Sequence, residues 1–238
     1  FYREFAAGAP GELGNIVRLG TIPPLPAVDE DLHFRPAIAV ASCYAGPVEE
    51  GERAVRALRQ FGAPLVDLVG PTLYVDHQSG IDDTVPHGWH YYWKGTSLDL
   101  SDDVIDIVAA HAYGATSPRS YAAMFHMGGA PSRAPRDATA FSGRDVDHVM
   151  SIDAVWLPDQ DDTVRAPETA WARAFLAALQ PHGAGVYVNF LDADDGTSRV
   201  REAYGDDTYR RLAEVKAKYD PGNVFHHNKN IRPSTPTQ

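Results

Sequence analysis

Strand-like and helix-like segments alternate irregularly along this chain, and that alternation most constrains what the chain can fold into. Short apolar runs bounded by proline or glycine predict strands, and apolar residues at helical spacing predict helices. No repeated strand–helix–strand unit carries a glycine-rich turn. Because such units build parallel sheets, we expect an α+β fold instead. Its antiparallel β-sheet would be covered by helices on one face and would contain ferredoxin-like elements.

The expected elements follow from these periodicities. Strands are predicted for residues 15–21, 36–44, 121–127, 148–157 and 186–191. Helices are predicted for residues 3–13, 51–61, the segment after Ser101, 167–179, 197–204 and 207–219. Ser101 is followed by Asp102 and Asp103, and a hydroxyl cap with acids in the first turn stabilises a helix start. The apolar run 36–44 is expected to be a buried strand.

Composition excludes several classes of protein. With 21 Lys and Arg against 32 Asp and Glu, the net charge is −11, whereas a nucleic-acid binder needs clustered cations. The longest nearly apolar run, residues 37–46, is about half of the ~20 residues that cross a bilayer. A single cysteine, Cys43, excludes an internal disulfide. We therefore expect neither a nucleic-acid nor a membrane partner, and self-association stays open.

Two weak metal-binding patterns do not predict a metal site. His87 and His90 have a zinc-like spacing, but zinc needs three or four ligands with compatible geometry. The acidic run 191–196 hints at a calcium loop, although its glycine comes one position early and position 12 is Ala203. Solvated or loop-anchoring histidines and a helix-capping turn explain these residues better.

Aromatic residues with polar tips are dense in residues 74–78 and 89–95. Such side chains bury flat apolar surface while they keep hydrogen-bonding groups near water. They predict either the pocket wall of a planar or sugar-like ligand, or a sheet face packed on a helix. The pattern alone favours neither alternative.

The carboxyl-terminal segment combines a helix stop at Asp220-Pro221 with an amide-rich tail. Phe225 is expected to be buried. Asn228 and Asn230 alternate, so their amides would point to the same side of an extended segment. Paired amides suit the donor and acceptor edge of a heterocycle.

Several motifs occur in the order typical of one family. Tyr187-Val188-Asn189-Phe190 and the closing run 219–231 resemble that family's carboxyl-terminal signature, and residues 128–135 and 138–141 resemble its glycine-pair segment. Nearly the whole chain is similar to the carboxyl-terminal part of the berberine bridge enzyme-like FAD-linked oxidases.

The resemblance implies a division of labour. In that family an amino-terminal domain binds FAD, usually covalently, and this segment lacks it. Residues 1–183 would be the substrate-binding domain, and residues 184–238 would be a tail that packs on the FAD domain. The chain begins Phe1-Tyr2-Arg3 without Met or a signal-peptide layout, so we expect that it is entered part-way along a longer protein. No compartment signal is visible, and a cytoplasmic location is weakly favoured over secretion.

The resemblance also implies oxidation of an alcohol, sugar, amine or phenol, with hydride transfer to the flavin and dioxygen as electron acceptor. Asp153 falls where relatives place a catalytic Glu or Gln, and desolvation of a carboxylate would raise its pKa towards neutrality. The alternative for Asp153 is a strand residue that points to solvent. Many relatives have Tyr where this chain has Phe190, so the base would be Asp153 or Tyr187.

The remaining site residues carry over by position. The substrate-binding candidates are Tyr74, Gln78, Trp93 and Lys94. The candidates that face the cofactor are Asn189, Asn228 and Asn230. The competing hypothesis, motivated by Phe190, is a non-catalytic small-molecule-binding domain that has retained the fold.

Overall fold

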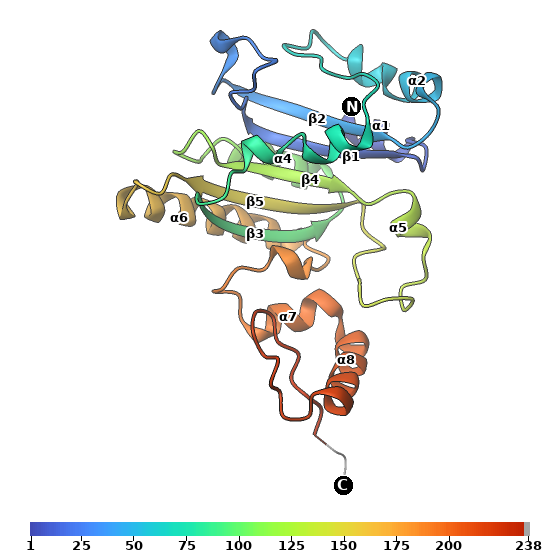
Figure 1. The fold of residues 1–238 in the computed structure, drawn as a ribbon, viewed down its shortest axis with the longest axis vertical. Helices are drawn as coiled ribbons and strands as arrows, with labels where there is room; N and C mark the ends of the chain where they lie inside the picture. The colour runs from blue at the N-terminus through green and yellow to red at the C-terminus, as the bar shows by residue number, and fades with distance from the viewer. Residues whose placement is uncertain (236–238) are drawn as a thin grey trace.

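A five-stranded antiparallel β-sheet forms the centre of the protein in a computed structural model that describes residues 1–235 (Figure 1). Its strands are β1 (Leu13–Thr21), β2 (Pro36–Tyr44), β3 (His90–Leu98), β4 (Tyr121–His126) and β5 (His148–Trp156). They lie in the order β2-β1-β4-β5-β3, and every neighbouring pair is antiparallel. The expected α+β class and antiparallel sheet are confirmed.

The main hydrophobic core lies between one face of this sheet and two helices, α4 (Asp102–His111) and α6 (Asp162–Leu179). Alternate residues of β5, among them Met150 and Ile152, are fully buried against Phe175 and Leu179 of α6. In Figure 1, α6 runs behind β5 and β3. Successive strand residues point to opposite faces, so the odd-numbered residues of β5 lie on the other face, which we call the open face.

The remaining helices surround this layer. They are α1 (Tyr2–Ala7), α2 (Val48–Arg59), α3 (Tyr74–Ser79), α5 (Ala130–Arg133), α7 (Thr197–Tyr204) and α8 (Asp206–Tyr219), with 3-10 turns η1 (Glu30–Leu32), η2 (Asp82–Thr84), η3 (Gln180–His182) and η4 (Val188–Phe190). The predicted cap is confirmed, since the Ser101 hydroxyl accepts a hydrogen bond from the Val104 N–H. In residues 1–235 no helix combines the length and apolar character that a bilayer crossing requires.

Four expectations are wrong. The helix predicted for residues 3–13 ends at Ala7, because Leu13 already pairs with β2 as the first residue of β1. Strand β2 has the predicted bounds, but it is a largely exposed edge strand, because only β1 pairs with it. Residues 186–191 contain the turn η4 (Val188–Phe190) rather than a strand, and Gly185, just before them, forms an isolated bridge to Ser97 of β3. Phe225 is 80% exposed, because its N–H and that of Val224 are held by the Asp220 carboxylate in a turn that presents both side chains outward.

The carboxyl-terminal segment seals the outer edge of β3. Ser97 exchanges backbone hydrogen bonds with Gly185 and Ala184. Further along the strand, the Trp93 N–H donates to Asp192 and the Gly95 carbonyl accepts from Arg199. An edge strand normally leaves such groups unpaired. Figure 1 shows the lobe that contains α7 and α8 beside β3. The division into a domain of residues 1–183 and a tail of residues 184–238 stays a prediction. Residues 236–238 of that tail lie outside the described residues.

One buried histidine on the helix-covered face predicts acid sensitivity. His148 is 2% exposed, neither ring nitrogen has a hydrogen-bond partner among the described residues, and the rings of Tyr2 and His126 lie within 6 Å. Burial, aided by His126 and opposed by Asp99, lowers the pKa of His148 to about 4. Between about pH 6.5 and pH 4, His148 therefore binds a proton in the unfolded chain but not in the folded chain.

Stability should fall as the pH drops from about 6.5 to about 4, with up to roughly 3 kcal/mol of the loss due to His148. Denaturant titrations at several pH values measure this loss. The His148→Phe variant should show a flatter pH dependence, whereas His87→Gln, at an exposed position, should behave like the wild type. Equal acid sensitivity in wild type and His148→Phe would contradict the assignment.

Candidate functional site

A group of side chains on the open face forms the first candidate site. Asp153 of β5 lies between Tyr121 of β4 and Trp93 of β3 in one cross-strand row. Arg18 of β1 pairs with Ala123, which is two residues from Tyr121 on β4, and its side chain extends towards this row. We call Arg18, Trp93, Tyr121 and Asp153 the open-face cluster. The sheet register therefore joins residues that are up to 135 positions apart in the sequence.

Asp153 has the electrostatic character of a proton acceptor. Its side chain is partly buried, and it accepts a hydrogen bond of 2.7 Å from the Ser151 hydroxyl. Burial raises the pKa of Asp153 to about 6, even though Ser151 and the positive charge of Arg18 favour the ionised form. A carboxylate that ionises near neutrality can take up a proton under ordinary conditions.

Arg18 is held by an aromatic ring rather than by a carboxylate. Its guanidinium carbon lies 4.3 Å from the centre of the Tyr121 ring, a cation–π arrangement. Nη1 donates one hydrogen bond of 2.6 Å to the Thr21 carbonyl. Burial lowers the pKa of Arg18, and burial together with the Asp153 charge raises the pKa of Tyr121. The Tyr121 hydroxyl thus stays protonated.

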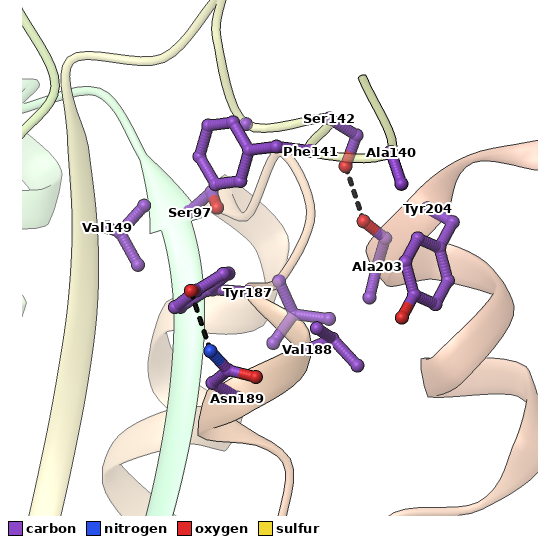
Figure 2. Close-up of a pocket in the computed structure, with 12 residues that line it drawn as sticks. Ser97, Ala140, Phe141, Ser142, Val149, Tyr187, Val188, Asn189, Ala203 and Tyr204 are labelled. Atoms are coloured by element: carbon purple, nitrogen blue, oxygen red, sulfur yellow. Dashed lines mark hydrogen bonds between the residues drawn. The ribbon is translucent and has the colours of Figure 1, made fainter. Parts of the chain in front are cut away.

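The second candidate site is a cavity of about 260 Å³ between the sheet and the carboxyl-terminal lobe. Figure 2 shows Tyr187 and Asn189 in its wall, with the Asn189 amide donating a hydrogen bond of 2.6 Å to the Tyr187 hydroxyl. The Ser142 hydroxyl donates to the Ala203 carbonyl on the opposite side. The other lining residues are Ser97, Ala140, Phe141, Gly143, Val149, Val186, Val188 and Tyr204. Burial raises the pKa of Tyr204, so its hydroxyl stays protonated.

Phe190 connects the two sites. Its ring centre lies 5.5 Å from that of Phe125 on β4 and 5.3 Å from that of Tyr187. A Cβ atom on Gly95 would lie 2.7 Å from the Phe190 Cβ, so only glycine allows this close approach. The phenyl ring therefore covers part of the open face, and it offers no atom that can accept a proton.

Lys94 lies on the face opposite to Trp93. Its ammonium group binds Asp194 and Asp195, the latter at 3.0 Å, and Arg173 of α6 binds Asp194 at 2.8 Å. Burial would lower the pKa of Lys94, but the hydrogen bonds to the two carboxylates raise it. Burial would likewise raise the pKa of Asp194, and its hydrogen bonds from Lys94, Arg173 and Tyr92 lower it instead. These ion pairs attach the carboxyl-terminal segment to β3 and α6.

The other predicted site residues are spread over the surface. Tyr74 is 81% exposed on α3, and Gln78 is exposed on the same helix. Asn228 is exposed with a positive φ of 58°, and Asn230 is half-buried in the tail. The structure thus brings Trp93 next to Asp153 and Tyr187 next to Asn189. Lys94, Tyr74 and Gln78 do not join either group, and the roles of all these residues stay predictions.

Sequence reasoning missed Arg18 and Tyr121. Their strands were predicted, but an arginine between Val17 and Leu19 has the pattern of a solvent-exposed residue on a half-buried strand. Only the pairing of β1 with β4 places Arg18 beside Tyr121. In residues 1–235 no group of three or more His, Cys, Asp or Glu side chains is arranged to hold a metal ion.

Solved structures of other proteins share this fold. The fold matches 6-hydroxy-D-nicotine oxidase from Arthrobacter nicotinovorans with a TM-score of 0.72 at 23% identity, over 98% of this chain and 49% of that one. It matches BBE-like 28 from Arabidopsis thaliana with a TM-score of 0.77 at 16% identity, over 98% of this chain and 53% of that one. The fold is therefore that of an FAD-linked oxidase substrate domain.

Sequence comparisons identify the family. Residues 186–232 match the family described as berberine and berberine like. An FAD-linked oxidoreductase of Dictyostelium discoideum is 32% identical over 201 residues, 82% of this chain and 42% of that protein. The chain belongs to the berberine bridge enzyme-like FAD-linked oxidoreductases, and it spans less than half of the length of this relative.

Proposed function

We propose that this chain is the substrate-binding part of an oxidase that removes a hydride and a proton from an alcohol, sugar, amine or phenol. The observation that carries the proposal is Asp153, a carboxylate with a raised pKa on the face of the sheet opposite to α4 and α6. Bound FAD would supply the hydride acceptor, with dioxygen as the final acceptor of two electrons and two protons, giving hydrogen peroxide.

The chain's own residues would bind the substrate and hold its proton. Asp153 accepts the proton from the hydroxyl or amine as the hydride leaves the carbon that bears this group or, in a phenol, a benzylic carbon conjugated with its oxygen. Trp93 and Tyr121, on either side of Asp153 in the sheet, orient the substrate and keep bulk water from the carboxylate. Orientation of the donor carbon relative to the base supplies a large part of the rate gain.

The open face suits a planar ring better than the cavity does. At about 260 Å³, the cavity is smaller than the roughly 300–1,000 Å³ of typical small-molecule pockets and cannot enclose a dinucleotide. We therefore propose that another part of the full-length protein holds most of the FAD. Asn189, Asn228 and Asn230 would then contact the flavin side of the complex.

The full-length protein should be yellow and should consume oxygen with some alcohol, sugar, amine or phenol. Absorbance spectra and an oxygen electrode, applied to a substrate panel, measure both properties. The chain of residues 1–238 alone should carry little or no FAD. A colourless full-length protein, or tight stoichiometric flavin on the chain alone, would contradict the proposal. A flavin-containing protein that no substrate reduces would favour the non-catalytic hypothesis.

A further inference from the structure

We propose that Arg18 binds a carboxylate group of the substrate, so that the substrate is a hydroxy acid, a class that includes the sugar acids. This inference rests on the proposed function and narrows its substrate class. The three features that carry it are the unused hydrogen-bonding capacity of Arg18, the local construction of the sheet around it, and the charge arrangement of the open-face cluster.

Most of the donors of Arg18 have no partner. A guanidinium carries five N–H donors, and the Thr21 carbonyl accepts from Nη1 alone. Among residues 1–235, no carboxylate oxygen lies within 4.0 Å of the guanidinium nitrogens. Arginine pairs with carboxylates through two parallel hydrogen bonds. A partly buried arginine without such a partner therefore offers a binding site for an anion.

The sheet is built to hold this side chain in place. Gly20 lies next to Tyr121, and a Cβ atom there would come within 2.8 Å of the Tyr121 Cβ. The Arg18 partner in β4 is the small residue Ala123, which leaves room for the guanidinium to lie over the Tyr121 ring. An arginine stacked on an aromatic ring is pre-organised, so less conformational entropy is lost when it binds a planar anion.

Charge then sets the orientation of the substrate. Asp153 lies close enough to Arg18 to feel its charge, but the two form no ion pair. An anionic group is repelled by Asp153 and attracted by Arg18. A hydroxy acid would therefore place its carboxylate on Arg18 and its hydroxyl at Asp153, with the hydride-bearing carbon between them. This two-point attachment is the arrangement that proton removal by Asp153 requires.

Arg18 could instead contact an acidic group in another part of the full-length protein or a phosphate of the cofactor. In that case substitution of Arg18 would release flavin or loosen the assembly without changing the preference for acids over neutral ligands. The experiment below separates this outcome from substrate recognition.

Calorimetric titration of the full-length protein with benzoate and with benzamide tests the inference without requiring turnover. Wild type should bind benzoate more tightly than benzamide. Arg18→Met should weaken benzoate binding about tenfold or more, as expected for a lost charge-assisted pair, and leave benzamide within about twofold. Arg18→Lys should be intermediate. Arg119→Met is the matched control, because Arg119 also stacks on aromatic rings, those of Trp89 and Phe34.

Turnover provides the second measurement. The ratio of kcat/KM for mandelate to that for methyl mandelate, and for glucuronate to that for glucose, should fall in Arg18→Met, mainly through KM of the acid. Equal binding of benzoate and benzamide by wild type, an equal effect of Arg18→Met on both, or loss of flavin in that variant would overturn the inference. Oxidation of only the neutral partners would overturn it while leaving the proposed function intact, whereas a colourless protein would overturn the proposed function.

Discussion

Asp153→Asn is expected to lower kcat/KM of the full-length protein by about 10²–10⁴-fold, the usual contribution of a general base. The amide has nearly the same shape, but it cannot accept the proton that leaves with the hydride. Steady-state oxygen consumption measures the loss. Tyr187→Phe is the matched variant at the other candidate base, and it should retain most of the activity.

The pH dependence gives the same assignment an independent check. Because burial raises the pKa of Asp153 to about 6, wild-type kcat/KM should rise with pH through about 6 as the carboxylate ionises. The opposite result for the two variants, in which Tyr187→Phe is inactive and Asp153→Asn is active, would place the base at Tyr187.

Asp153→Asn should also leave the fold as stable as the wild type or more stable above pH 6. An Asp with a folded pKa of about 6 and an unfolded pKa of about 3.9 makes stability fall as the pH rises between these values. The amide removes this penalty of up to roughly 3 kcal/mol. Thermal unfolding at pH 8 measures it, and a marked drop in the midpoint would mean that lost activity reflects damage to the fold.

Lys94→Met is expected to destabilise the protein by about 3–5 kcal/mol, because it leaves two carboxylates without their buried partner. The Lys94 side chain is 6% exposed and that of Asp195 is 8% exposed, so water replaces little of the lost interaction. The segment from Gly185 to Arg199 should loosen first, since Lys94 attaches it to the sheet. Denaturant titration and hydrogen exchange of this segment measure the two effects.

The matched control is Arg136→Met, which breaks an exposed ion pair with Asp145 and should cost less than about 1 kcal/mol. A double variant that combines Lys94→Met with Asp195→Asn should recover part of the stability, because it removes the buried charge that lost Lys94, whereas Asp194 keeps its ion pair with Arg173. Equal destabilisation by Lys94→Met and Arg136→Met would contradict the structural role of Lys94.

Local sequence patterns predicted most of the helices and strands, since the formation of these elements depends on residues that are close together in the sequence. The Ser101 cap and the helix Thr197–Tyr204 follow from spacing that is visible in the sequence. Residues 186–191 have the apolar composition of a strand, but the β3 edge beside them is also occupied by the side chains of Asp192 and Arg199. No strand pattern records such contacts between side chain and backbone.

The candidate site was predictable only in part. The family resemblance singled out Asp153, and the structure places it on the open face; its catalytic role stays a prediction. Arg18 and Tyr121 could not be found because their contact depends on the register of β1 and β4. Lys94 and Trp93 were expected in one pocket, but adjacent strand residues point to opposite faces, which separates them.

The two edges of the sheet differ in whether another strand can pair with them. At the β3 edge, residues 184–199 form hydrogen bonds with backbone groups of the strand. At the other edge, no strand of residues 1–235 pairs with the outer side of β2. Residues 36–44 contain no charged side chain, and charge is a common natural safeguard against unwanted strand addition. A strand supplied by another polypeptide would therefore add to this sheet at β2 alone. Self-association of the chain by strand addition would start at that edge.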